Sequence, residues 1–147
     1  MQQNLLLMWL ALVFWATGQI WLAQRTVYPL FAKVGENEYI GYHSFYTRSI
    51  RLTVILPGFA TFLLPIAMFF YVPAVSTALH AANIGVGVIG LLVTVGLEIP
   101  RHNKLERIGK NDRIIAELVR YNWPRTASIT AQAVIAVLMF RDAQPLW

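Results

Sequence analysis

The chain has no cysteine and few charged residues for its length. The absence of cysteine among 147 residues excludes disulfides and thiolate metal sites. Charged residues make up 13% of the chain, about half the share that is usual in a soluble domain. Hydrophobic residues make up 57%, which is more apolar surface than a soluble fold of this size can bury. The composition therefore predicts a single integral membrane domain over residues 1–147.

A basic stripe on a soluble face is also missing. The net charge is +5, but the basic residues lie in the polar intervals between long apolar stretches. This distribution is typical of membrane topology, so we expect no nucleic-acid partner.

Four apolar stretches supply the candidate membrane spans. About 20 apolar residues cross a hydrocarbon core of about 30 Å. The stretches predict helices over residues of about 5–25, 50–72, 74–97 and 124–140. The first is expected to be a retained helix that ends before Pro29, because residues 1–4 lack the basic side chain of a signal peptide. Pro57 and Pro65 are expected to kink the second helix.

The segment before the fourth span has a helical pattern of its own. Ile114, Ile115, Leu118 and Val119 fall on one helical face, after a possible cap at Asn111 or Asp112. We predict an amphipathic helix here that continues into the fourth span. The predicted fold is therefore all-α, an integral membrane four-helix bundle with a cytoplasmic amphipathic helix leading into helix four.

Four spans place the segments 29–50 and 98–123 on the same side of the membrane. Eleven of the twelve lysines and arginines fall on that side, and only Arg141 does not. Basic residues near helix ends stay in the cytoplasm. We therefore expect a bacterial inner membrane protein with these two segments cytoplasmic, both termini outside, and membrane lipids as its surroundings.

Small and polar residues follow helical spacing within the spans. Gly85, Gly87 and Gly90 match G-x-G-x-x-G, but no strand precedes them, so close helix packing is the better interpretation. Each predicted helix also has one polar stripe, and such stripes normally face the bundle interior. The stripe of the first helix includes Gln24 and Tyr28. Together the four stripes predict a polar pocket at the cytoplasmic face.

Four polar residues at the cytoplasmic face are candidates for catalysis: His43, Glu98, His102 and Arg125. Burial and neighbouring charges shift such groups toward a working pKa, so acid/base chemistry is available to them. A structural ion pair between Glu98 and Arg125 is the competing interpretation. His43, Glu98 and His102 also form a two-histidine, one-carboxylate set, which would suit a non-heme metal. The residues lack a diagnostic spacing, so we expect no cofactor and keep the metal site as an alternative.

The chain resembles the anthrone-oxygenase-like family of small four-helix membrane proteins. The matching pieces are Val27-Tyr28-Pro29-Leu30-Phe31, Tyr42-His43, the eight residues from Glu98 to Leu105, and Asn122-Trp123-Pro124-Arg125-Thr126. Members are mostly uncharacterised, and a few are linked to oxygenation of anthrones without a cofactor. The resemblance implies a site that includes Tyr28, His43, Glu98, His102, Asn103, Asn122, Trp123 and Arg125. Pro124 departs from the aliphatic residue expected there, which puts the placement of Arg125 in doubt.

These observations lead to two hypotheses of function. In the first, the pocket binds an apolar aromatic or quinone-like molecule, and the protein is a cofactor-independent oxygenase. Here His43 or His102 is the base, Glu98 orients it, and Arg125 with Asn122 stabilises an oxyanion; Gln24, Tyr28, Asn103 and Trp123 bind the ligand. In the second, the chain is a structural or accessory subunit of a homo-oligomer or larger membrane complex that binds partner helices, lipid or pigment. A small transporter fits less well, since four spans leave little room for a path.

Overall fold

The computed structural model describes residues 1–143, and every regular element within that range is helical. The first helical run comprises α1 (Gln2–Leu22), the π-helical turn η1 (Ala23–Val27) and α2 (Tyr28–Phe31). The second is α3 (Tyr39–Ser49). The third joins η2 (Arg51–Ile55) to α4 (Leu56–Tyr71). The fourth comprises α5 (Thr77–Val93), η3 (Thr94–Glu98) and α6 (Ile99–Ile108), and the fifth is α7 (Asp112–Asp142).

Three of these runs are long and apolar enough to cross a membrane: Gln2–Phe31, Arg51–Tyr71 and Thr77–Ile108. The all-helical class and the membrane character of the chain agree with the prediction. The predicted fourth span, residues 124–140, is not among the three. It lies inside α7, where Arg125, Ser128 and Gln132 lower the mean hydropathy.

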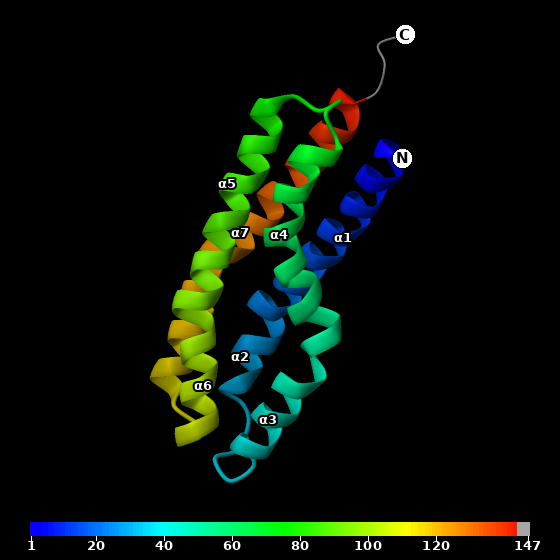
Figure 1. Ribbon diagram of the computed structural model, residues 1–147. Coiled ribbons are helices and arrows are strands. Elements are labelled where there is room, and N and C mark those ends of the chain that lie inside the picture. The colour runs from blue at the N-terminus through cyan, green and yellow to red at the C-terminus, as the bar shows by residue number, and fades with distance from the viewer. Residues whose placement is uncertain (144–147) are drawn as a thin grey trace.

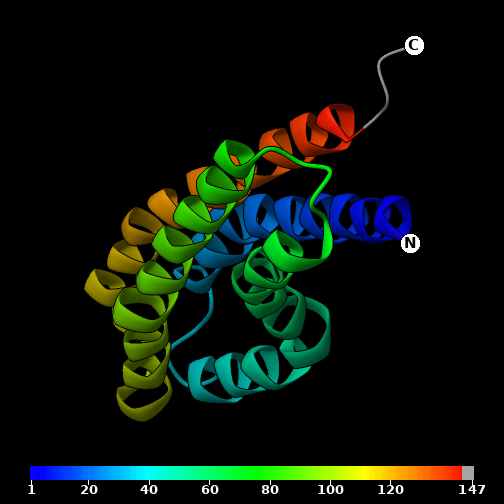
Figure 2. The ribbon, with the colours of Figure 1, turned by 45° about the horizontal axis from the view of Figure 1, so that its top comes forward.

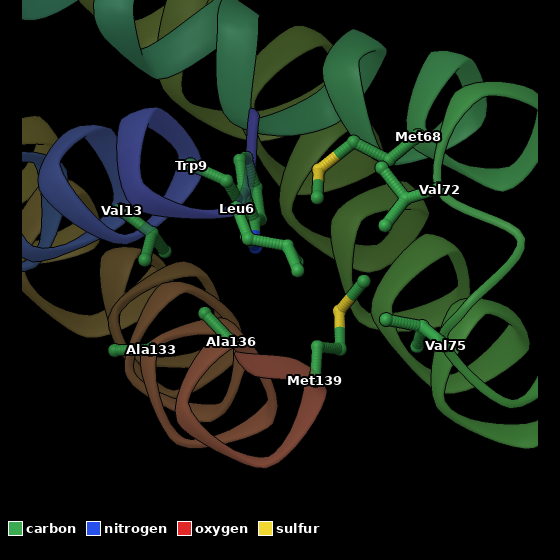
Figure 3. Close-up of a cluster of buried hydrophobic side chains, with 9 residues drawn as sticks. All are labelled: Leu6, Trp9, Val13, Met68, Val72, Val75, Ala133, Ala136 and Met139. Atoms are coloured by element: carbon green, nitrogen blue, oxygen red, sulfur yellow. The ribbon is translucent and has the colours of Figure 1, made fainter. Parts of the chain in front are cut away.

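The long helices pack around one another with both described ends at the same end of the molecule (Figure 1). α7 packs against α1 and α5, and α4 packs against the same two helices. Near the ends of the chain, nine apolar side chains form a core (Figure 3): Leu6, Trp9, Val13, Met68, Val72, Val75, Ala133, Ala136 and Met139. Met68 and Met139 point into the space between the helices, where their flexible thioethers fill an irregular gap (Figure 3).

A second apolar core lies at the opposite end, among η1, α2, α3, α6 and α7. Phe31, Tyr39, Leu105 and Leu118 are fully buried there, together with Ile115. The predicted amphipathic segment begins α7: the Asn111 side chain accepts a hydrogen bond from the Ile114 backbone nitrogen at 3.1 Å. Its apolar face fills this second core.

Three prolines follow the three π-helical turns. Each lies two residues beyond the turn, as Tyr28-Pro29, Leu56-Pro57 and Ile99-Pro100. Proline donates no backbone hydrogen bond and its ring displaces the carbonyl four residues earlier, so one wider turn lets the helix continue. The predicted ends of the first and third helices, near residue 25 and residue 97, are therefore wrong. The helical runs extend to Phe31 and Ile108.

Side chains from other helices satisfy two carbonyls that prolines leave free. The Thr53 carbonyl, four residues before Pro57, accepts a hydrogen bond from Trp15 Nε1 at 3.0 Å. The Thr61 carbonyl, four residues before Pro65, accepts one from Gln132 Nε2 at 2.8 Å. These bonds join α4 and its preceding turn to α1 and to α7. An interior proline also lies in α7 at Pro124, and the helix passes through it unbroken for 31 residues.

Two of the glycines in α5 allow close packing against α4 and α7. A Cβ at Gly90 would lie 2.9 Å from Phe62 Cε1, and one at Gly87 would lie 3.0 Å from Gln132 Nε2. Gly85 has no such neighbour within 4 Å. The packing interpretation of the glycine pattern therefore holds for its second and third members only.

Candidate functional site

A cavity of about 330 Å³ lies among the three π-helical turns, at one depth along the helix bundle. Its polar lining includes Tyr28 from α2, Tyr46 from α3, Glu98 from η3, His102 from α6 and Arg125 from α7. Thr47, Arg51, Thr94, Asn103 and Glu106 are further polar residues of the lining. Much of the remaining lining is apolar: Ile20, Ala23, Ile50, Val54, Ile55, Phe59, Phe62 and Ile99. π-helical turns occur frequently at functional sites, and all three here contribute residues to the lining of this cavity.

A chain of hydrogen bonds leads away from the cavity into the protein. His102 Nε2 lies 3.3 Å from the Tyr28 hydroxyl, and His102 Nδ1 lies 3.0 Å from His43 Nε2. His43 is fully buried, and its Nδ1 has no hydrogen-bond partner. Three groups from α2, α3 and α6 are thereby connected, although only Tyr28 and His102 line the cavity.

Aromatic rings enclose the two histidines of this hydrogen-bonded series. Phe31 packs edge-on against both imidazoles, with ring centroids 5.4 Å from His43 and 6.1 Å from His102. Tyr39 stacks on His43 at 5.8 Å. This desolvation lowers the pKa of His43, and the charge of Glu106 opposes it only in part. His43 is accordingly neutral at neutral pH, with one ring nitrogen that donates and one that accepts.

Glu98 is the most unusual group in the cavity wall. Its side chain is 1% exposed, and neither carboxylate oxygen has a hydrogen-bond partner. Arg125 lines the same cavity at 9% exposure, and its Nε is also unpartnered. No ion pair within 4 Å joins the two among the described residues; the ion pairs found there are those of Glu117 with Arg101 and Arg113. The expected Glu98–Arg125 ion pair is therefore absent. Buried polar groups are normally satisfied, and these two are the members of the cavity lining whose buried polar atoms lack a partner.

Other predicted site residues lie elsewhere. Gln24 and Asn122 are buried but bond to each other, with Asn122 Nδ2 donating to Gln24 Oε1 at 2.9 Å, and neither lines the cavity. Trp123 is 42% exposed and packs edge-on against Trp21, at a centroid distance of 5.8 Å, on an outer face. Asn103 does line the cavity, at its exposed edge. The polar pair therefore ties α7 to the end of the first helix, while Trp123 lies outside the site.

Tyr46 was not among the predicted site residues, although it lines the cavity and stacks on His102 at 6.4 Å. Burial raises the pKa of Tyr46 to about 12, with the Arg125 charge opposing. A signal was present in the sequence, because Tyr46 follows His43 by three residues and shares its helical face. Glu106 also lines the cavity and follows His102 by four residues, so the same spacing would have found it.

The alternative metal site does not assemble. Among residues 1–143 no group of three or more histidine, aspartate or glutamate side chains is placed to hold a metal ion. His43 Nε2 and His102 Nδ1 lie 3.0 Å apart and are joined by a hydrogen bond.

Comparisons with family models, with curated proteins and with solved structures found no match to this chain. The site is therefore interpreted from its own residues.

Proposed function

We propose that the chain is an integral membrane protein of four spans, with α7 as the fourth. Three of its helical runs are long and apolar enough to span, and α7 packs against α1 and α5 beside them. The polar residues that lower the hydropathy of α7 are turned inward: Ser128 and Gln132 are buried, and Gln132 bonds to the Thr61 carbonyl. A helix whose polar side chains face the inside of the bundle can span the membrane, because those side chains are not exposed to lipid.

The orientation follows from the basic residues. Eleven of the twelve lysines and arginines lie toward the cavity end of the molecule. We place this end, with segments 29–50 and 98–123, in the cytoplasm of a bacterial cell and the first residue outside. The last four residues lie beyond the described part of the chain.

Single cysteines provide a direct test, because the chain has none of its own. Glu36→Cys and Ala74→Cys both lie in exposed loops, at opposite ends of the molecule. A membrane-impermeant maleimide applied to intact cells should label the cysteine at position 74 and reach position 36 only after lysis. The reverse pattern would show the opposite orientation, and labelling of both in intact cells would contradict a spanning bundle.

The cavity, on this proposal, binds an apolar aromatic or quinone-like molecule. The observation that carries this is the unpartnered Glu98 carboxylate in a largely apolar cavity of about 330 Å³. Ligand pockets of about 300–1,000 Å³ with apolar walls and a few convergent polar groups are typical of small-molecule sites. Glu98 accepts a proton or a hydrogen bond from the ligand, while the Tyr28 hydroxyl and Arg125 are the donors available to a ligand oxygen.

The reaction we propose is oxygenation of an activated methylene by O₂. Glu98 removes a C–H proton that lies next to a carbonyl, and the electron pair moves onto the carbonyl oxygen, which Tyr28 and Arg125 stabilise. The resulting carbanion transfers an electron to O₂, and the two radicals combine to form a C–O bond. Loss of the second C–H proton with cleavage of the O–O bond leaves a new carbonyl. The net change is R₂CH₂ + O₂ → R₂CO + H₂O.

This assignment changes the expected roles. His102 has both ring nitrogens engaged and His43 does not line the cavity, so Glu98 is the better-placed base. The histidines instead relay protons to and from Tyr28. Asn122 bonds to Gln24 and does not donate into the cavity.

Binding and turnover test the proposal separately. A hydroxynaphthoquinone titrated into the protein in lipid nanodiscs should bind, and Glu98→Gln should weaken binding by at least about tenfold, the loss of one charged hydrogen bond. Glu106→Gln is the matched control, since Glu106 lines the same cavity at its exposed edge, and it should change binding by less than about twofold. O₂ uptake with an anthrone should also be lost in Glu98→Gln. If neither the wild-type protein nor either variant binds the hydroxynaphthoquinone, the pocket proposal is refuted and the accessory-subunit hypothesis is favoured.

A further inference from the structure

Packed residues bound the cavity on three sides, although Arg51, Asn103 and Glu106 of its lining are exposed at the cytoplasmic edge. Its rear wall is Ile20, Ala23 and Tyr28, all 6% exposed or less. Toward the cytoplasmic end, the bond between His43 and His102 joins α3 to α6. Toward the membrane centre, Phe62 packs directly on the Gly90 backbone and joins α4 to α5.

The fourth side is a mouth between η2–α4 and η3–α6. Its two lips carry Ile55 and Ile99, each 38% exposed and each part of the cavity lining. Figure 2 shows α3 and α4 on one side of this region and α6 on the other. Ile55 ends the π-helical turn η2 and Ile99 follows the turn η3, and each lies shortly before a proline, so the same local feature shapes both lips.

The mouth is amphipathic along the membrane normal. The run through η2 and α4 leaves the cytoplasmic end while the run through η3 and α6 approaches it, so residues of the two runs lie at matching depths in reverse order. Arg51 and Asn103 are exposed polar residues of the lining, and Ile55 and Ile99 are exposed apolar residues of it. The surface beside the apolar part is apolar too, with Leu56 62% and Val95 52% exposed.

We propose that the ligand enters this mouth sideways from the bilayer, and that it carries an apolar chain which stays between Ile55 and Ile99 after its polar ring has reached Glu98. This inference rests on the proposed function and adds the class of ligand: a ring with an ionisable hydroxyl or carbonyl group and a long hydrocarbon substituent. Ile55 lies in the candidate span Arg51–Tyr71, and Ile99 lies in the helical run Thr77–Ile108 just past the end of the proposed span, so both lips lie at the membrane boundary. From there the hydrocarbon substituent of the ligand would reach the lipid over the exposed Leu56 and Val95. The polar end of the mouth places the ring near the headgroup level.

The experiment compares one hydroxynaphthoquinone without a chain and the same ring with a decyl chain, both titrated into the protein in nanodiscs. The decyl substituent should strengthen binding, measured against ligand in water, by at least about tenfold, because transfer of each methylene from water to apolar surroundings is worth about fourfold and part of the substituent packs between Ile55 and Ile99. Ile99→Trp fills the apolar lip and should remove that gain while the chainless ring still binds within about threefold of wild type. Ile55→Trp repeats the test from the other lip, in case one variant fails to fold.

Leu92→Trp is the control, because Leu92 is 65% exposed on α5 and does not line the cavity. Leu92→Trp should bind the decyl ligand as much more tightly than the chainless ligand as the wild-type protein does. A loss of this difference in Ile99→Trp but not in Leu92→Trp would then reflect contact in the mouth and not partition of the decyl group into lipid. Loss of the gain in Asn103→Trp, with both isoleucine variants unchanged, would show that the ligand enters from water and would overturn the inference. If neither ligand binds the wild-type protein or any of the variants, the result would instead refute the proposed function on which this inference rests.

Discussion

Removing the charge of Glu98 should stabilise the protein while it abolishes binding. The carboxylate is 1% exposed, and neither oxygen accepts a hydrogen bond. The folded state therefore bears the cost of its desolvation, which the neighbouring Tyr28 and the charges of Arg125 and Arg101 offset only in part. Such a group costs about 1–3 kcal/mol, and more when it is charged. Methionine has a similar length, has no polar atom that needs a partner except a weakly accepting sulfur, and adapts to irregular space. Glu98→Met should therefore raise the free energy of unfolding of the unliganded protein by about 1–3 kcal/mol.

Thermal unfolding in detergent, followed by circular dichroism, measures this effect. For a chain of this size, each kcal/mol corresponds to roughly 2–4 °C in Tm. Glu117→Met provides the contrast, because Glu117 is paired with Arg101 at 3.1 Å and with Arg113 at 3.5 Å. Its loss should lower stability by about 0–1 kcal/mol, as for other partly exposed ion pairs. A lower Tm for Glu98→Met would refute the reasoning, since it would mean that the carboxylate has a structural partner.

Three further outcomes follow from the packing and the buried polar groups. Gly90→Ala should destabilise the protein by about 1–3 kcal/mol and reduce binding, because its Cβ would lie 2.9 Å from Phe62 in the cavity wall; equal stability to wild type would contradict this. Burial lowers the pKa of His43, so the unfolded chain takes up its proton first and stability should fall as the pH drops below about 6.5. That fall in the free energy of unfolding, measured with denaturant, should be smaller in His43→Phe than in the wild-type protein. If the two proteins show the same pH profile, His43 is not its cause. Trp15→Phe leaves a proline-freed carbonyl without its donor and should cost about 1 kcal/mol in the same assay, whereas Phe14→Leu, at a neighbouring exposed position, should cost less.

The candidate site was only partly predictable from the sequence, and the reason differs from residue to residue. Tyr28, Glu98, His102 and Arg125 all line the cavity, because polar groups in apolar helices turn away from lipid. Gln24 and Asn122 obey the same rule, but Asn122 Nδ2 donates to Gln24 Oε1, 98 positions away in the sequence, and neither residue reaches the cavity. Helical spacing shows that a polar side chain faces the inside of the bundle. It does not show whether a side chain of another helix forms a hydrogen bond with it.

Composition alone determined the kind of protein, because so much apolar surface in 147 residues has no place except a membrane, and the positions of the basic residues favour one orientation. The tertiary structure decided where the site is and how it opens. Pro29, Pro57 and Pro100 are far apart in sequence, and the predictions drawn from Pro29 and Pro57, a helix end and a kink, concerned one helix each. Packing brings their three π-helical turns to one level, and there they surround the cavity that Glu98 faces. Proline chemistry acts on its own helix, whereas the coincidence of three such turns depends on how those helices pack together.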